Sequence, residues 1–332
     1  MSWKSRYLPP NPTAWLGRTD VPTNAYFHQH IQLANLLKQT VEKTLENTFA
    51  LIGFKCDEGV QRDLGRSGSI EGPMAIRQRL ANLPIQKSTI ACYDVGDIIC
   101  VDHDLEASQQ ALSEIIALLL SKNIITIVIG GGHELAWGHY QGIAKQYSIE
   151  KRLGIINFDA HFDLHSLHPR HLAGATTAFY QIAEAHSAEK RHFDYNCVGI
   201  QPAGNIRQLF DIAKHYHVRH LLADDIHQGL REKSFDFIDR IIDENDIIYL
   251  SLSLDVFSAA FAPGVSSIQP LGLNPWDVIP LIRQTAASGK VVSYDIVEHV
   301  PRYDIDHRTA KLAASLIYEI IHHHNDQKIS FA

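Results

Sequence analysis

The chain has 332 residues, of which 45% are hydrophobic, and a formal net charge of -7. This length allows one large α/β domain or two ordinary domains with an extensive buried core. The mildly acidic balance and the scattered basic residues provide no electrostatic attraction to nucleic acid or to an anionic membrane surface, and we expect neither as a partner.

The first predicted feature along the chain is an N-terminal extension. Residues 1–24 contain four prolines among polar residues, a composition that favours an irregular path over the surface. A helix is predicted over residues 27–47. We expect residues 1–48 to pack as an extension on the rest of the chain.

From residue 49 onward, strand-like and helix-like segments alternate. Strands are predicted at 49–54, 93–99, 124–129, 153–158, 196–200, 220–223, 247–254 and 291–297. Helices are predicted at 74–81, 105–121, 137–146, 173–185, 205–216, 235–242 and 309–323. Short Ile- and Val-rich runs are typical of buried parallel strands, and their alternation with helices predicts a doubly wound α/β sheet covered on both faces. No repeat or linker divides the chain, so we expect residues 1–332 to form a single domain.

The cysteines and the start of the chain bear on its compartment. The four cysteines, Cys56, Cys92, Cys100 and Cys197, show no Cys-x-x-Cys spacing, and so few thiols in so long a chain do not indicate a disulfide framework. The first six residues lack the apolar core of a signal peptide, and no apolar stretch is long enough for a membrane span. The sequence therefore predicts a cytoplasmic protein.

Metal-ligand side chains follow four of the predicted strands. The residues at these strand ends are His133, Asp159 with His161 and Asp163, Asp255, and Glu298. Open α/β sheets bind their ligands in the crevice beyond the carboxyl ends of the strands. The sequence therefore predicts a metal-dependent hydrolase.

The strongest local motif is Asp159-Ala160-His161-Phe162-Asp163. In extended backbone, residues two apart face the same way, so two carboxylates and an imidazole would converge on one volume, an arrangement that is costly without a cation. Taken singly, the motif could be a surface loop, His133 a structural hydrogen-bonding residue and Asp255 a helix cap. Their joint occurrence favours a metal site, and carboxylates with imidazole suit Mn²⁺, Fe²⁺ or Zn²⁺.

Several segments resemble the ureohydrolase family of arginases, agmatinases and formimidoylglutamases. They are Gly131-Gly132-His133-Glu134, residues 159–163, residues 249–264 and Val297-Glu298. Their order and separation also match, so the resemblance covers most of residues 50–325. Residues 53–73 and the Trp137-Gly138 pair resemble the formimidoylglutamase branch.

The resemblance implies a three-layer α/β/α fold with an eight-stranded, mostly parallel sheet. It also implies manganese-dependent hydrolysis of N-formimidoyl-L-glutamate to formamide and L-glutamate, a step of histidine degradation, by a homo-oligomer, commonly a trimer or hexamer. By position, His133 and Asp163 would hold one Mn²⁺, His161 and Asp255 a second, and Asp159 would bridge them. Asp163 would also orient the nucleophile, a water activated by the metal.

The resemblance assigns Glu298 to substrate binding, and the charge of the product suggests further candidates. Glu298 would accept hydrogen bonds from the cationic formimino nitrogen. The two carboxylates of the product call for cationic, bidentate donors, for which arginine is suited. Arg62, Arg66 and Arg170 are the candidates, although each can also be interpreted as a surface or structural residue.

Two positions depart from the arginase pattern. Ser253 stands where arginase-type members have a second bridging Asp, so the site has one negative charge fewer and binding of the second ion is in question. Residues 173–178 lack the histidine that arginases use in proton transfer, which weighs against arginase itself. The alternatives are another ureohydrolase, such as an agmatinase or guanidino-acid hydrolase, or a weakened member that serves as a binding or assembly partner.

Overall fold

The computed structural model describes residues 3–20, 22–147, 150–167, 172–229 and 231–326. A single sheet runs through the molecule. Nine of its ten strands follow the order β1-β4-β3-β5-β10-β9-β6-β7-β8, and the tenth, β2, lies off this path and pairs with β4. The strands are β1 (Tyr7–Leu8), β2 (Gln32–Leu33), β3 (Asn47–Lys55), β4 (Ile90–Ile99), β5 (Ile125–Ile129), β6 (Leu153–Phe158), β7 (Asp194–Ile200), β8 (Arg219–Leu222), β9 (Ile247–Ser253) and β10 (Val291–Val297).

The strands β3 to β10 are joined by parallel pairing only. All eight predicted strands are present, and the predicted α/β fold with a mostly parallel sheet is confirmed. The N-terminal region adds the two-residue strands β1, which is antiparallel to β4, and β2, which is parallel to it. β-Branched side chains suit strands covered on both faces, and the Ile-Thr-Ile-Val-Ile sequence of β5 is buried except at its first residue.

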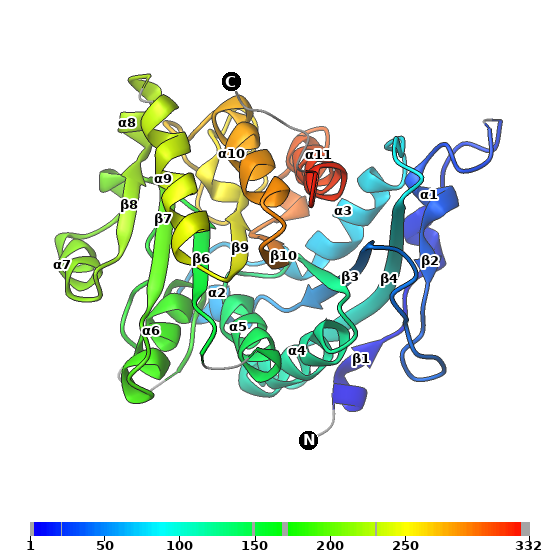
Figure 1. The fold of residues 1–332 in the computed structure, drawn as a ribbon, viewed down its shortest axis with the longest axis horizontal. Coiled ribbons are helices and arrows are strands. Elements are labelled where there is room, and N and C mark those ends of the chain that lie inside the picture. Colours follow the sequence, from blue (N-terminus) through cyan, green and yellow to red (C-terminus); the bar gives the residue numbers. More distant parts are fainter. Residues whose placement is uncertain (1–2, 21, 148–149, 168–171, 230, 327–332) are drawn as a thin grey trace.

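Helices cover both faces of the sheet, as Figure 1 shows. The helices are α1 (Phe27–His30), α2 (Glu58–Arg62), α3 (Gly72–Leu80), α4 (Leu105–Leu120), α5 (Leu135–Gln146), α6 (Ala178–Ala188), α7 (Arg207–His215), α8 (Ala223–His227), α9 (Arg231–Glu244), α10 (Pro275–Ala287) and α11 (Arg308–His323). One face packs against α3, α9, α10 and α11, and the other against α4, α5 and α6. Each face has its own apolar core.

The prediction of a helix over residues 27–47 is wrong. The structure has the four-residue helix α1, the short strand β2 and irregular backbone in this region. The backbone N–H groups bond to distant parts of the chain: that of Ala34 donates to the Asp94 carbonyl at 2.9 Å and that of Leu36 to the Tyr7 hydroxyl at 3.0 Å. Tertiary pairing along the edge of β4 therefore overrides the local helix preference.

Two other differences lie near the carboxyl edge of the sheet. Helix α10 was not predicted, although Asn274 and Pro275 form a typical helix start and the Asp277 carboxylate accepts a hydrogen bond from the Asn274 backbone N–H at 3.0 Å. The helix predicted at 173–185 begins at Ala178, because Ala175–Thr177 forms a 3-10 turn.

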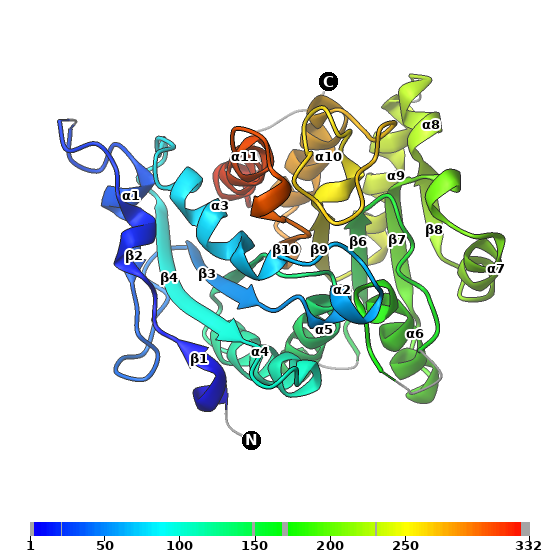
Figure 2. The ribbon, with the colours of Figure 1, turned by 180° about the vertical axis from the view of Figure 1, so that it is seen from behind.

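α2, which follows β3, lies in front of the sheet in Figure 2.

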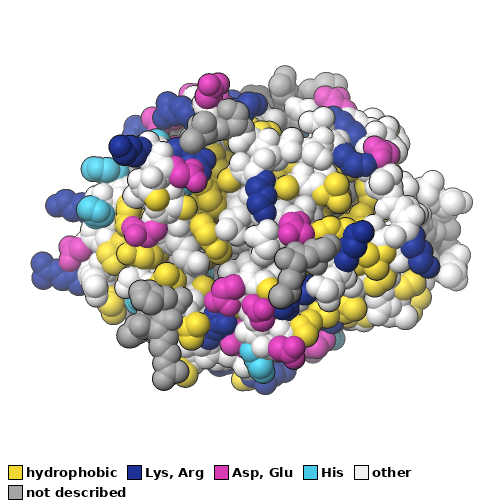
Figure 3. All heavy atoms as spheres, turned by 90° about the horizontal axis from the view of Figure 1, so that it is seen from below, with side chains coloured by type: hydrophobic (Ala, Val, Ile, Leu, Met, Phe, Trp, Pro, Cys, Tyr) yellow, Lys and Arg dark blue, Asp and Glu magenta, His cyan; other side chains and the backbone are white. Residues whose placement is uncertain are grey.

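The face formed by α4, α5 and α6 is mixed in character. Acidic, basic and apolar side chains are interspersed on it, without a field of one sign (Figure 3). None of the helices in the described part of the chain combines the length and the apolar character that a membrane crossing requires.

Candidate metal centre

A glycine turn after β5 places His133 at the carboxyl edge of the sheet. Gly130 and Gly131 have φ of 73° and 78°, values that side chains other than glycine rarely adopt. A Cβ at Gly131 would lie 2.6 Å from the Phe54 carbonyl oxygen. The backbone can therefore pass close to the end of β3 only with glycine here, and the next residues return toward β10.

The segment after β6 brings two carboxylates and an imidazole together. Asp159 Oδ1 accepts the His161 backbone N–H at 2.7 Å, and Asp163 has a φ of 49°. The predicted convergence of the three side chains is present, but the extended backbone from which we predicted it is not. A bend, rather than strand periodicity, turns Asp163 toward the same volume.

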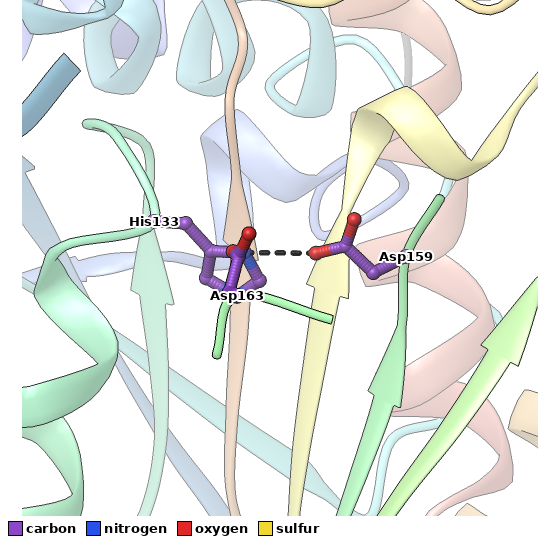
Figure 4. A group of neighbouring side chains, drawn as sticks. All are labelled: His133, Asp159 and Asp163. Atoms are coloured by element: carbon purple, nitrogen blue, oxygen red, sulfur yellow. Dashed lines mark ion pairs between the residues drawn. The ribbon is translucent and has the colours of Figure 1, made fainter. Parts of the chain in front are cut away.

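The first ligand group consists of His133, Asp159 and Asp163. His133 Nδ1 lies 2.9 Å from Asp159 Oδ2 and 2.8 Å from Asp163 Oδ2, so that an imidazole from the turn after β5 meets two carboxylates from the segment after β6 (Figure 4). All three are buried. Burial lowers and the adjacent carboxylates raise the pKa of His133, and the carboxylates prevail, so that the pKa lies well above its usual value.

The second ligand group consists of Asp159, His161 and Asp255. His161 Nδ1 lies 3.4 Å from Asp159 Oδ1 and 3.2 Å from Asp255 Oδ2. Asp255 follows β9 in a 3-10 turn, and its Oδ1 accepts a hydrogen bond from Ser253 Oγ at 2.7 Å. Ser253 therefore lies at the position expected of a site residue, with a hydroxyl in place of a carboxylate.

The two groups share Asp159, and within each group the potential ligand atoms lie within 4.8 Å of one another. Burial opposes ionisation of Asp159, yet the imidazoles of His133 and His161 lower its pKa. Burial and the charge of Asp159 raise the pKa of Asp163 to about 6. Three buried carboxylates with two imidazole nitrogens directed among them are a donor set suited to divalent cations, so these residues fit a metal site.

Glu298 lies beside these groups at the end of β10. Its Oε1 accepts the His133 backbone N–H at 2.8 Å, and its own backbone N–H donates to Gly131 O at 3.0 Å. Burial, followed by the charge of Asp255, raises its pKa to about 8. A cation beside this carboxyl group would favour its ionised form.

A cavity of about 170 Å³ opens over the two ligand groups. Its lining includes Ser253 and Glu298, together with residues of three loops, namely Val60, Asp63, Gly65, Ala175, Thr176, Ser266 and Ser267. We compared the segments 53–73 and 173–178 with the family pattern but assigned none of these loop residues to the site, and we did not single out Ser266 or Ser267. Their place at the cavity follows from how the loops fold over the strand ends.

The structure places the candidate arginines differently from our expectation. The Arg62 guanidinium donates to Glu58, Glu106 and two backbone carbonyls. Arg66 donates to the carbonyls of Ser266 and Val265 and stacks on Tyr303, with Cζ 4.1 Å from the ring centroid. Neither side chain lines the cavity, because protein partners hold both guanidinium groups. Arg170 lies outside the described residues.

Comparison with known proteins gives the relationship. The sequence pattern of the arginase family matches residues 47–323. The chain belongs to the arginase family. One family relative is the formimidoylglutamase of Legionella pneumophila (strain Lens), which is 39% identical over 317 residues that cover 96% of this chain and 98% of the relative.

Two solved structures share the fold. Formimidoylglutamase from Bacillus subtilis matches with a TM-score of 0.78 at 22% identity, over 96% of this chain and 95% of the other. Trypanosoma cruzi formiminoglutamase with Mn²⁺ matches with a TM-score of 0.76 at 22% identity, over 86% of this chain and 95% of the other. At these identities the structural likeness bears on the fold alone.

Proposed function

We propose that this protein is a manganese-dependent formimidoylglutamase, which hydrolyses N-formimidoyl-L-glutamate to formamide and L-glutamate in histidine degradation. The observation that carries the proposal is the pair of ligand groups that share Asp159 and whose other members, His133, His161, Asp163 and Asp255, line one cavity. The full-length similarity to formimidoylglutamases supports the substrate. A linear amidine is a hydrolysable C–N compound of the class on which the arginase family acts.

We assign the roles of the ligand residues by geometry. His133 and Asp163 would hold one Mn²⁺, His161 and Asp255 a second, and Asp159 both, because its two oxygens face different imidazoles. Each histidine would bind through Nδ1, the atom that faces the carboxylates. When bound, manganese would polarise the amidine and lower the pKa of a water molecule. Asp163 would orient that water.

Glu298 would bind the formimidoyl group. Its carboxyl group is buried and lies close to the carboxyl group of Asp255, and both effects disfavour its ionised form. A formamidinium cation beside it would supply the positive charge that stabilises the carboxylate. Its hydrogen bond from the His133 backbone fixes its position relative to that ligand. Glu298 would therefore hold the amidine carbon above the two ligand groups, with the glutamate portion toward Ser266, Ser267 and Thr176 in the cavity.

Three further properties of the protein are its domain organisation, its compartment and its assembly. We propose a single domain, 1–332, with residues 1–48 as an extension; Trp15 Nε1 donates to buried Asp94 at 2.7 Å, which anchors that extension on β4. We propose a cytoplasmic enzyme, for which the four free thiols are typical. We also propose a homo-oligomer, a trimer or hexamer, on the basis of family resemblance.

The function is tested with purified protein that has been stripped of metal and reloaded with Mn²⁺. We expect formamide and L-glutamate to be released in equal amounts from N-formimidoyl-L-glutamate, and neither to be released by the stripped protein. Agmatine and L-arginine serve as competing substrates. Urea release from either of them, with formimidoylglutamate intact, would identify another ureohydrolase, and inactivity on all three despite bound metal would favour a weakened binding member.

A further inference from the structure

A buried polar network lies directly behind His133, on the side away from the carboxylates. His133 Nε2 lies 2.8 Å from Ser251 Oγ, and Ser251 Oγ donates to Asp295 Oδ1 at 2.6 Å. His133 is 2% exposed, and Ser251 and Asp295 are completely buried. No bulk water can replace either bond, so each group depends on its protein partner.

The direction of these hydrogen bonds determines the state of His133. The Asp295 carboxylate accepts bonds, so the Ser251 hydroxyl hydrogen points to Asp295 and its oxygen is left to accept the His133 Nε2–H. A proton on Nε2 leaves the lone pair of the neutral ring on Nδ1, the atom that faces Asp159 and Asp163. The chain from Asp295 thus selects the tautomer that can bind a metal.

Asp295 itself is held from two other sides. Tyr249 OH donates to its Oδ2, and His139 Nδ1 lies 2.7 Å from the same oxygen. His139 Nε2 in turn contacts Ser293 Oγ. These contacts, from α5, β9 and β10, fix the carboxylate that orients Ser251.

Among the described residues, the second imidazole has no comparable support. The His161 side chain is 20% exposed, and within the described part of the chain its Nε2 has long contacts to neutral groups only, 3.4 Å to Ser267 Oγ and 3.3 Å to Gln269 Nε2. The two imidazoles are therefore unequal: a buried carboxylate supports one, and a partly exposed loop contacts the other.

We propose that Asp295 is a positioning residue that acts through Ser251 to fix His133. As a result, the metal position at His133 binds its ion more tightly than the position at His161. This inference rests on the metal site of the proposed function. Asp295 does not touch the metal or the substrate in this arrangement. Its effect is on the ring that would bind the ion.

Direct Mn²⁺ binding tests this inference without any measurement of activity. Metal-free protein is titrated with Mn²⁺ by calorimetry and electron paramagnetic resonance, and two classes of site with unequal affinity are expected. S251A should weaken the tighter class by about 10- to 100-fold, the usual effect of losing a partner of a metal-binding histidine, and change the looser class by less than about threefold. H161N should remove the looser class, which assigns the two.

S293A is the matched control. It deletes a hydroxyl from the same buried network, on the far side of His139, without touching His133 or Ser251. Both variants should lower the thermal stability of the metal-free protein, but only S251A should weaken the tighter class. Equal Mn²⁺ binding by S251A and the unmodified protein would mean that Ser251 is merely structural and would overturn the inference.

D295N extends the test to the carboxylate. It should weaken the tighter class, and the S251A/D295N double variant should bind no more weakly than the weaker single variant, because both changes interrupt one chain. Additive losses, or equal affinity of both sites in the unmodified protein, would overturn the inference. If D295N does not fold, the comparison of Mn²⁺ binding by S251A and S293A decides whether the inference holds. Failure of the unmodified protein to bind Mn²⁺ at all would instead overturn the proposed function.

Discussion

Ser253 is a single neutral residue among the carboxylates of the candidate site, and a charged residue in its place would change the charge of that site. It lines the cavity and donates to Asp255, one of the proposed ligands. We expect S253D to bind the looser Mn²⁺ roughly tenfold or more tightly, because each added ligand charge strengthens binding of a hard cation. Calorimetric titration of the metal-free protein measures this affinity.

The neutral variant S253N is the control for Ser253, since it is similar in size to S253D but adds no charge. It should leave the affinity for the looser ion within about threefold of the unmodified protein. An unchanged affinity in S253D would show that the side chain at 253 does not point at the metal position.

Glu298 is the carboxylate that would face the charged group of the substrate. The variant E298Q keeps an acceptor for the His133 backbone N–H but loses the charge that would face the formamidinium cation. We expect kcat/KM for N-formimidoyl-L-glutamate to fall about 10²- to 10³-fold, as for other electrostatic contacts to reacting groups. Mn²⁺ content should stay unchanged. Activity within threefold of the unmodified protein would remove Glu298 from the substrate site.

At the scale of elements, the turn between β5 and α5 positions His133. G131A should destabilise the fold by about 3 kcal/mol or more, because its Cβ would meet backbone oxygens of Phe54 and Cys56 and its φ is unfavourable. G229A is a matched control with a similar φ of 85° and nothing within 4 Å, and should cost only about 1 kcal/mol. Chemical denaturation measures both; equal losses would mean that the close approach at Gly131 is unimportant.

Strands and helices differ in how far the sequence alone determines them. Ile- and Val-rich runs predicted the eight main strands, because buried parallel strands carry that composition wherever they lie in the sheet. The irregular course of residues 31–46 was not predictable, since its hydrogen bonds go to Asp94 and Tyr7, which are distant in sequence. Helix α10 could have been predicted from its Asn274-Pro275 start.

The candidate site was predictable for a different reason. Its ligand types stand directly after strands, and strand ends meet whatever the intervening chain does. The bend at Asp163, the partners of Arg62 and Arg66, and the serines that line the cavity depend on loop conformation. The network from Asp295 to His133 depends on the register of β9 with β10, which pairs Ser251 with Asp295, and no local pattern contains that register.

At the scale of the whole molecule, the site joins four adjacent strands at the centre of the sheet. In spatial order these are β5, β10, β9 and β6, and they contribute His133, Glu298, Asp255 and Asp159. His133 and Glu298 are 165 positions apart in the sequence. A cation bound here would therefore connect parts of the chain that come together only in the folded state.

Metal removal should consequently lower the stability of the whole fold. Without a cation, Asp159, Asp163 and Asp255 are buried close together and repel. Mn²⁺ at 100 times its dissociation constant should stabilise the protein by about 2.7 kcal/mol, and raise Tm by about 4 °C. Scanning calorimetry of stripped and Mn²⁺-loaded protein measures the difference, with Mg²⁺, which prefers oxygen ligands alone, as the comparison ion. A Tm that is the same in both states would mean that no ion links these strands.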